Sequence, residues 1–292
     1  MILAVSSANA DDEIVISGNL VATSTLTVDK NITLKTLNTN ALINLDTVTT
    51  YVINVKAGTL ELKGTESYPI IFDGGANDGQ TLNYERFLGI TSSGCANISY
   101  VTFQNLHGSS TSAAIFANSS GGTVNINNST IDNIKGKMGT GIYASSLSIL
   151  NISNCVIQNC EATSDGACVY LPAATTCNIN NTQMKNNKVT AATSDQFGGG
   201  AMTISHANAV VTIDENSVIE SNSSNTSGGG IIMDSGTLYI KNASIMNNTA
   251  TNYGQNIYST TDNAGSSGVV YINDVQQELG AIDKDIINGI IQ

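Results

Sequence analysis

Carboxylic side chains are the groups in this sequence best suited to catalysis, because enzymes that cleave polysaccharides use paired or calcium-binding carboxylates. The best acidic candidate is the group of Asp214, Glu215 and Glu220. It falls at an expected turn, where exposed acids are common. No catalytic residues are therefore predicted, and the pattern favours a non-enzymatic protein while leaving an enzyme open.

Metal and thiol chemistry have few candidates. The two histidines, His107 and His206, are expected at the surface, and the spacing of the five cysteines matches no zinc pattern. We expect the cysteines to pack as small core residues, with a disulfide between Cys155 and Cys160 as the alternative. The segment Asp73–Gly79 has the composition of a calcium loop without EF-hand spacing. We predict no cofactor and no metal, with Ca²⁺ at this segment as the alternative to a plain turn.

A recurring column of large side chains is the best candidate for a binding surface. Each member follows an apolar or small residue, and the members are Phe116, Tyr143, Tyr170, Met202, Met233 and Tyr258. If the preceding residue points inward, strand alternation sends the column outward, where it could contact sugar rings or a partner protein. In the opposite register the column belongs to the core. From it we predict a ligand-binding stripe of Phe116, Tyr143, Tyr170 and Tyr258.

A repeated unit must position these side chains. Each unit contains a four-residue motif: Asn, then a small residue, then any residue, then Ile or Met. The motif begins at Asn128, Asn154, Asn181, Asn216 and Asn242. The apolar anchor recurs after 26, 27, 35 and 26 residues, a period that indicates stacked supersecondary units. Short alternating apolar stretches predict strands. Asn fits the turn between strands because it tolerates left-handed backbone and its amide can bond to the next rung.

The sequence therefore predicts an all-β fold, a single-domain parallel β-helix (solenoid) with about 26–28 residues per rung over residues 11–274. The 35-residue step is expected to contain a polar loop near residues 189–197. Within residues 275–292, spacings of three or four predict a short capping helix with Leu279, Ile282, Ile286 and Ile290 on one face. Residues 1–10 end in Ala8-Asn9-Ala10 and are interpreted as the remnant of a secretion signal, with a first strand as the alternative.

The charge balance disfavours two classes of partner. The chain has 23 acidic and 11 basic residues and a net charge of −12, whereas nucleic acids and anionic membrane surfaces need a basic footprint. No apolar run approaches the length of a membrane-spanning helix. We predict no nucleic-acid partner and no membrane insertion.

Two stretches resemble known β-helix families. A Gly-Gly-small-Ile motif is found in the repeats of the chlamydial polymorphic membrane proteins. It is matched here by Gly199-Gly200-Ala201-Met202 and Gly229-Gly230-Ile231-Ile232, and residues 97–258 resemble the adhesin-like repeats of those proteins. Residues 55–105 look like the opening rungs of large bacterial and archaeal β-helix surface proteins. Both resemblances imply a right-handed β-helix that is extracellular or at the cell surface. The repeat, the acidity and the lack of a recurring catalytic group favour a non-enzymatic, adhesin-like protein that binds a glycan or a surface protein along one face. The same pectin lyase-like architecture houses polysaccharide lyases and glycoside hydrolases, so a carbohydrate-active enzyme is the alternative function.

Overall fold

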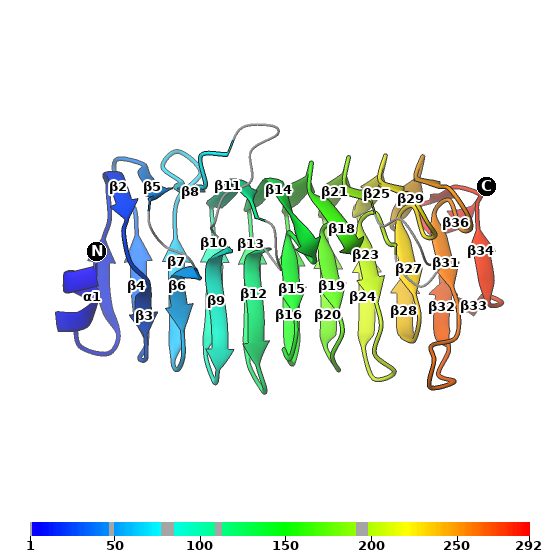
Figure 1. The fold of residues 1–292 in the computed structure, drawn as a ribbon, viewed down its shortest axis with the longest axis horizontal. Helices are drawn as coiled ribbons and strands as arrows, with labels where there is room; N and C mark the ends of the chain where they lie inside the picture. The colour runs from blue at the N-terminus through cyan, green and yellow to red at the C-terminus, as the bar shows by residue number, and fades with distance from the viewer. Residues whose placement is uncertain (1, 47–49, 77–84, 109–112, 191–197) are drawn as a thin grey trace.

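Short parallel strands stack along one axis into a solenoid (Figure 1). The computed structural model describes residues 2–46, 50–76, 85–108, 113–190 and 198–292. Each rung contributes one strand to each of three sheets, here called A, B and C, and every rung is paired in parallel with the next. The predicted all-β parallel β-helix is confirmed.

Sheet A contains β1 (Asp12–Val15), β4 (Ile32–Lys35), β7 (Thr59–Lys63), β10 (Cys95–Ser99), β13 (Thr123–Asn127), β16 (Ile149–Ser153), β20 (Thr176–Asn180), β24 (Val210–Asp214), β28 (Gly236–Ile240), β32 (Gly268–Ile272) and β33 (Val275–Gln276). Sheet C contains β3 (Leu26–Val28), β6 (Tyr51–Val55), β9 (Arg86–Ser92), β12 (Ala113–Ser119), β15 (Ile142–Ala144), β19 (Val169–Leu171), β23 (Met202–Ile204), β27 (Ile231–Met233), β31 (Ile257–Ser259) and β34 (Gly280–Ile282).

Sheet B has a main path and a side arm. The main path contains β2 (Gly18–Ala22), β5 (Ala41–Leu45), β8 (Ile70–Asp73), β11 (Val101–His107), β14 (Thr130–Met138), β17 (Val156–Gln158), β21 (Gln183–Lys185), β25 (Val218–Glu220), β29 (Ser244–Met246), β35 (Ile286–Ile287) and β36 (Ile290–Ile291). The side arm contains β18 (Glu161–Asp165), β22 (Lys188–Val189), β26 (Ser223–Ser224) and β30 (Thr249–Ala250).

The core is a set of apolar columns inside the coil. In sheet A, Ile126, Ile152, Ile179 and Ile213 are buried and paired in register from rung to rung. Burial of each such side chain contributes roughly 1.5–3 kcal/mol. In sheet A, alternation along the strand gives each of these buried residues a less buried neighbour, so the same register that builds the core also builds columns on the surface.

The recurring Asn forms the turn between sheets A and B, as predicted. Asn128, Asn154 and Asn181 have φ of 48°, 53° and 44°, in the left-handed region that Asn tolerates. The small residue after it joins two rungs: the Ser129 hydroxyl accepts from the Val101 backbone N–H at 3.1 Å and donates to the Asn127 carbonyl at 2.8 Å. The repeat phrase is therefore a hydrogen-bonded turn.

A second Asn column, inside the coil, was not predicted. Asn187, Asn222 and Asn248 are at most 4% exposed and follow the bend between the main path and side arm of sheet B. Asn222 Oδ1 accepts from the Asn187 backbone and side-chain N–H groups at 3.0 and 2.9 Å. Asn222 Nδ2 donates to the Met184 carbonyl at 2.9 Å and to Asn248 Oδ1 at 3.0 Å. The amides thus satisfy backbone groups that the bend leaves without strand partners.

The two ends of the coil are closed differently. At the N-terminal end, α1 (Ile2–Ser7) buries Val5 and contacts β3, so residues 1–10 include a helix instead of the alternative first strand. The interpretation of these residues as a secretion-signal remnant stays a prediction. In the described part of the chain, no helix has the length and apolarity to cross a membrane.

The predicted C-terminal capping helix is wrong. Residues 275–291 contain four short strands that pair antiparallel with the last rung and with each other, and Leu279 and Ile290 are exposed. Gly280 and Gly289 have positive φ, which interrupts a helix. Strands also satisfy the open backbone edges of β29, β31 and β32, which a helix would leave unpaired.

We expect the internal amide ladder to contribute strongly to stability. The change Asn222→Ala leaves the Asn187 N–H and the Met184 carbonyl without partners, at a cost of roughly 2–5 kcal/mol. Urea unfolding of the wild type and the variant measures this loss of unfolding free energy. The matched control is Asn178→Ala in the exposed ladder on sheet A. Among the described residues its amide donates only to Asn151 Oδ1, and its loss should cost about 1 kcal/mol or less. Equal losses in the two variants would contradict this role.

Candidate functional site

The predicted stripe lies on the outer face of sheet C. Tyr143 sits between the buried residues Ile142 and Ala144 and is half-buried itself. It is paired in register with Phe116 on one side and with Tyr170 on the other. Of the two registers left open by the sequence, the structure has the outward one for these residues.

Two members of the wider sequence column were placed wrongly. Met202 and Met233 are fully buried, and the column continues in register from Tyr170 through Thr203 and Ile232, whose side chains are also buried. The sequence alignment slipped by one residue because it matched glycines of different roles. Left-handed glycines lie three residues before the first core residue of the sheet C strand in five successive rungs, namely Gly139, Gly166, Gly199, Gly228 and Gly254. Aligning these glycines would have given the correct register.

Three of the predicted residues form one stack. The ring centroids of Phe116 and Tyr143 are 5.2 Å apart and those of Tyr143 and Tyr170 are 5.3 Å apart, with interplanar angles of 29° and 25°. Tyr258 is separated from them by the rungs of Thr203 and Ile232 and stacks on Tyr253 at 5.4 Å. We call Phe116, Tyr143 and Tyr170 the aromatic ladder. Since its rings lie against one another, their faces are covered and the ladder presents mainly ring edges, while burial raises the pKa of the Tyr170 hydroxyl.

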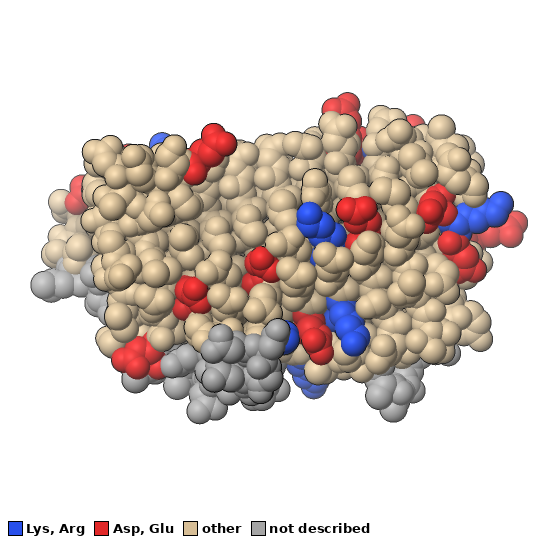
Figure 2. All heavy atoms as spheres, turned by 90° about the horizontal axis from the view of Figure 1, so that it is seen from above, with Lys and Arg blue, Asp and Glu red and all other residues tan. Residues whose placement is uncertain are grey.

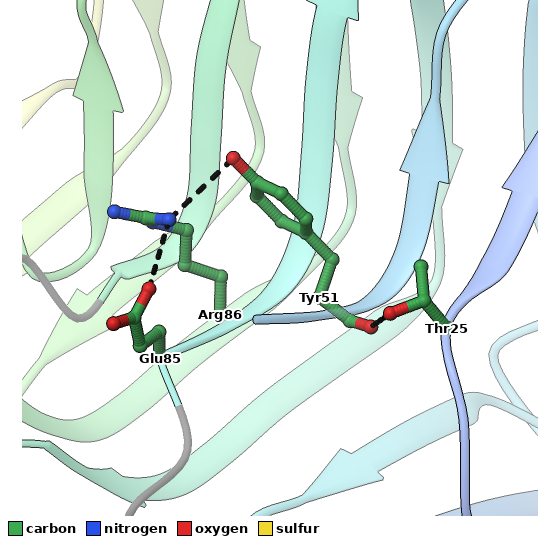
Figure 3. Close-up of polar contacts among 4 residues, drawn as sticks. All are labelled: Thr25, Tyr51, Glu85 and Arg86. Atoms are coloured by element: carbon green, nitrogen blue, oxygen red, sulfur yellow. Dashed lines mark hydrogen bonds and ion pairs between the residues drawn. The ribbon is translucent and has the colours of Figure 1, made fainter. Parts of the chain in front are cut away.

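Arg86 closes the N-terminal end of the aromatic ladder. Its guanidinium carbon lies 4.2 Å from the Phe116 ring centroid and 5.3 Å from that of Tyr51, a cation–π arrangement. Arg86 donates to Glu85 at 3.1 Å and to the Tyr51 hydroxyl at 3.4 Å (Figure 3). Gly89 occupies the ladder position on this rung, and a Cβ there would lie 2.4 Å from the Tyr51 ring. The missing side chain makes room for Tyr51.

Carboxyl groups lie near the other end of the ladder. The Ser205 hydroxyl donates to the Tyr170 hydroxyl at 3.5 Å. Burial raises the pKa of Asp234 to about 7, and the charges of Asp165 and Asp262 add to the shift. Burial also raises the pKa of Asp165 to about 6, opposed by its 2.6 Å hydrogen bond from Ser164. Both carboxyls therefore hold protons much closer to neutral pH than ordinary aspartates do.

Sequence reasoning missed these two carboxyls because their environment comes from separate rungs. It had singled out Asp214, Glu215 and Glu220 instead. In the structure Glu215 is exposed in a turn, where its backbone N–H donates to Asp214 Oδ1 at 2.9 Å. This is the solvated corner that the sequence favoured.

The cysteines and His107 have structural surroundings. All five cysteines are free, and burial raises the pKa of Cys155 to about 11 and of Cys160 to about 12, so neither is a nucleophile at neutral pH. His107 is 2% exposed and bonds Asn133 Oδ1 at 2.9 Å, so its expected surface position is wrong. Asp73 accepts from Gln104 at 2.7 Å, while residues 77–79 of the calcium-like segment lie outside the described residues.

Metal ligands do not converge in the described ranges, where no group of three or more His, Cys, Asp or Glu could hold an ion. Most of the polar loop expected near residues 189–197 lies outside those ranges. In comparisons with known proteins, no protein-family model and no curated protein matches this chain.

The raised pKa of Asp234 predicts a pH-dependent stability. Between an unfolded pKa of roughly 3.9 and a folded pKa of about 7, the folded state binds more protons, so stability falls as pH rises through this window. Asp234→Asn should flatten the profile and raise Tm at pH 8 by a few degrees. Thermal unfolding from pH 4 to pH 8 measures the Tm of both proteins. The change Asp29→Asn, at an exposed position, is the control for the loss of one charge. A lower Tm for Asp234→Asn at pH 8 would overturn the assignment.

Proposed function

We propose that this protein is an exported, non-enzymatic, adhesin-like surface protein that binds a glycan along the outer face of sheet C. The observation that carries the proposal is the continuous aromatic ladder of Phe116, Tyr143 and Tyr170. Surface apolar groups in a contiguous row are typical of interaction sites, and tyrosine combines an apolar body with a polar tip. Export is supported by the resemblance to surface β-helix repeats and by the Ala8-Asn9-Ala10 pattern.

The ladder suits a repeating ligand. Each rung presents the same kind of group at a constant interval, so a chain of sugars lying along the axis would meet an equivalent contact at each step. Phenolic hydroxyls can bond sugar hydroxyls, and the ring edges offer apolar contacts to the sugar C–H groups. Stacking and in-register pairing already fix the side-chain rotamers, so little conformational entropy is lost on binding. Arg86 occupies one end of the row, which directs the ligand along the ladder toward Tyr170.

A glycan-array screen followed by a double variant tests this function. Tyr143→Ala with Tyr170→Ala should weaken binding of any hit by roughly tenfold or more, since about 1.4 kcal/mol corresponds to tenfold in Kd. The matched control is Tyr239→Ala with Tyr271→Ala, because these half-buried tyrosines form a similar stack at 5.0 Å on sheet A. Binding that survives the ladder change, or falls equally in both double variants, contradicts the proposal. Hits only on surface proteins would reassign the ladder to a protein partner.

The second candidate function is a carbohydrate-active enzyme, a lyase or a hydrolase. The raised pKa values of Asp165 and Asp234 favour it, because a carboxyl protonated near neutral pH can act as a general acid. Incubation with neutral and acidic polysaccharides, followed by assay of reducing and unsaturated ends, separates the two functions. The binding proposal predicts no turnover. Turnover that Asp234→Asn abolishes, at unchanged ligand affinity, would establish the enzyme.

A further inference from the structure

A polar trough runs along sheet B, on a different face from the aromatic ladder. Asn105, Asn133, Asn159 and Asn186 take left-handed φ of 55° or 56° and bend each rung between the main path and the side arm. The trough at this bend has a volume of about 550 Å³. Ten residues line it, of which nine carry amide, carboxylate or ammonium groups and the tenth is Cys160.

One half of the trough is fixed by its own hydrogen bonds. Both oxygens of Asp132 accept amide hydrogens, from Gln158 at 2.9 Å and from Asn159 at 2.8 Å. Asn133 donates to Asn105 Oδ1 at 3.0 Å and bonds the buried His107 at 2.9 Å. This half is a preorganised floor whose polar groups are already oriented.

The other half offers groups without intramolecular partners. Glu161 and Lys188 are paired in register on adjacent rungs, yet within the described residues their side chains form no hydrogen bond or ion pair. The Asn186 amide, two residues before Lys188, likewise has no side-chain partner there. A carboxylate, an ammonium and an amide thus face one small area, which supplies acceptors and donors together.

The charges of the trough cancel. Lys135 and Lys188 oppose Asp132 and Glu161, so the lining has no net charge. Figure 2 looks down on this face and shows that its basic side chains gather toward the C-terminal half, among acidic ones. An anionic or cationic polymer would meet repulsion as well as attraction, whereas hydroxyl groups can both donate to carboxylates and accept from ammonium and amide groups. The lining therefore favours a neutral polyhydroxylated ligand.

We propose that this trough is a second binding site, for a neutral linear glycan that lies along the solenoid axis. From Asn105 to Asn186 the trough spans four rungs, or three steps of roughly 4.8 Å, so it accommodates about three or four pyranose residues. Affinity is expected to rise from disaccharide to tetrasaccharide and to change little with longer chains. Since the interaction is between dipoles and a charge-balanced surface, salt should alter it little.

Calorimetric titration with cellotetraose, xylotetraose and mannotetraose, and with the corresponding disaccharides and hexasaccharides, tests the site. Glu161→Gln with Lys188→Gln keeps the net charge and should weaken tetrasaccharide binding roughly tenfold, since about 1.4 kcal/mol corresponds to tenfold in Kd. Asn186→Gly deletes the amide while glycine retains the left-handed turn, and should weaken it at least threefold. The matched control is Asn216→Gly, an exposed left-handed Asn at the other turn, which should leave binding unchanged.

The assignment would be overturned if no neutral tetrasaccharide bound at millimolar concentration or if both trough variants kept native affinity. Preferential binding of tetragalacturonate that weakens with salt would overturn it too. Loss of tetrasaccharide binding in Tyr143→Ala with Tyr170→Ala but not in the trough variants would also overturn it, while supporting the aromatic ladder as the glycan site. The two proposals can therefore fail independently.

Discussion

Side-chain hydrogen bonds between successive rungs hold the register on which every other feature depends. Asn222 bonds both the rung before it and the rung after it, and the Ser129 hydroxyl at the A–B turn bonds the rung before it. A slip of one residue would exchange inside and outside along a whole strand. Buried amides make such a slip costly, because their partners would be lost in a place that water cannot reach.

The surface sites follow from this constraint. Phe116, Tyr143 and Tyr170 stack because equivalent outward positions recur at a constant interval, with no separate element needed to support them. Arg86 and Tyr51 extend the row because Gly89 leaves its ladder position empty. The trough on sheet B depends on the left-handed Asn bends in the same manner. A scaffold of fixed register thus turns a repeated sequence into rows of identical or complementary groups.

Features that recur in every rung could be predicted from the sequence. Features that depend on the surroundings of a residue in one particular rung could not. Asn128, Asn154 and Asn181 identified the turn, and Tyr143 was correctly paired with its neighbours in the stripe. Met202 was misplaced by one residue because the sequence comparison matched glycines of different roles in successive rungs. Asn187 and its ladder were missed because Leu106, Ile134 and Cys160 occupy the same position in earlier rungs, which hides a polar column. The pKa shift of Asp234 arises from burial that only the folded rungs create.

Hydrogen exchange of side-chain amides tests the central role of the internal ladder most directly. In an assigned NMR spectrum, the Nδ2 hydrogens of Asn187, Asn222 and Asn248 should exchange as slowly as backbone amides in the central strands, because they are buried and bonded across rungs. Exposed amides such as that of Asn19 provide the fast reference. Exchange of the three buried amides as rapid as that of Asn19 would show that the ladder does not hold the register.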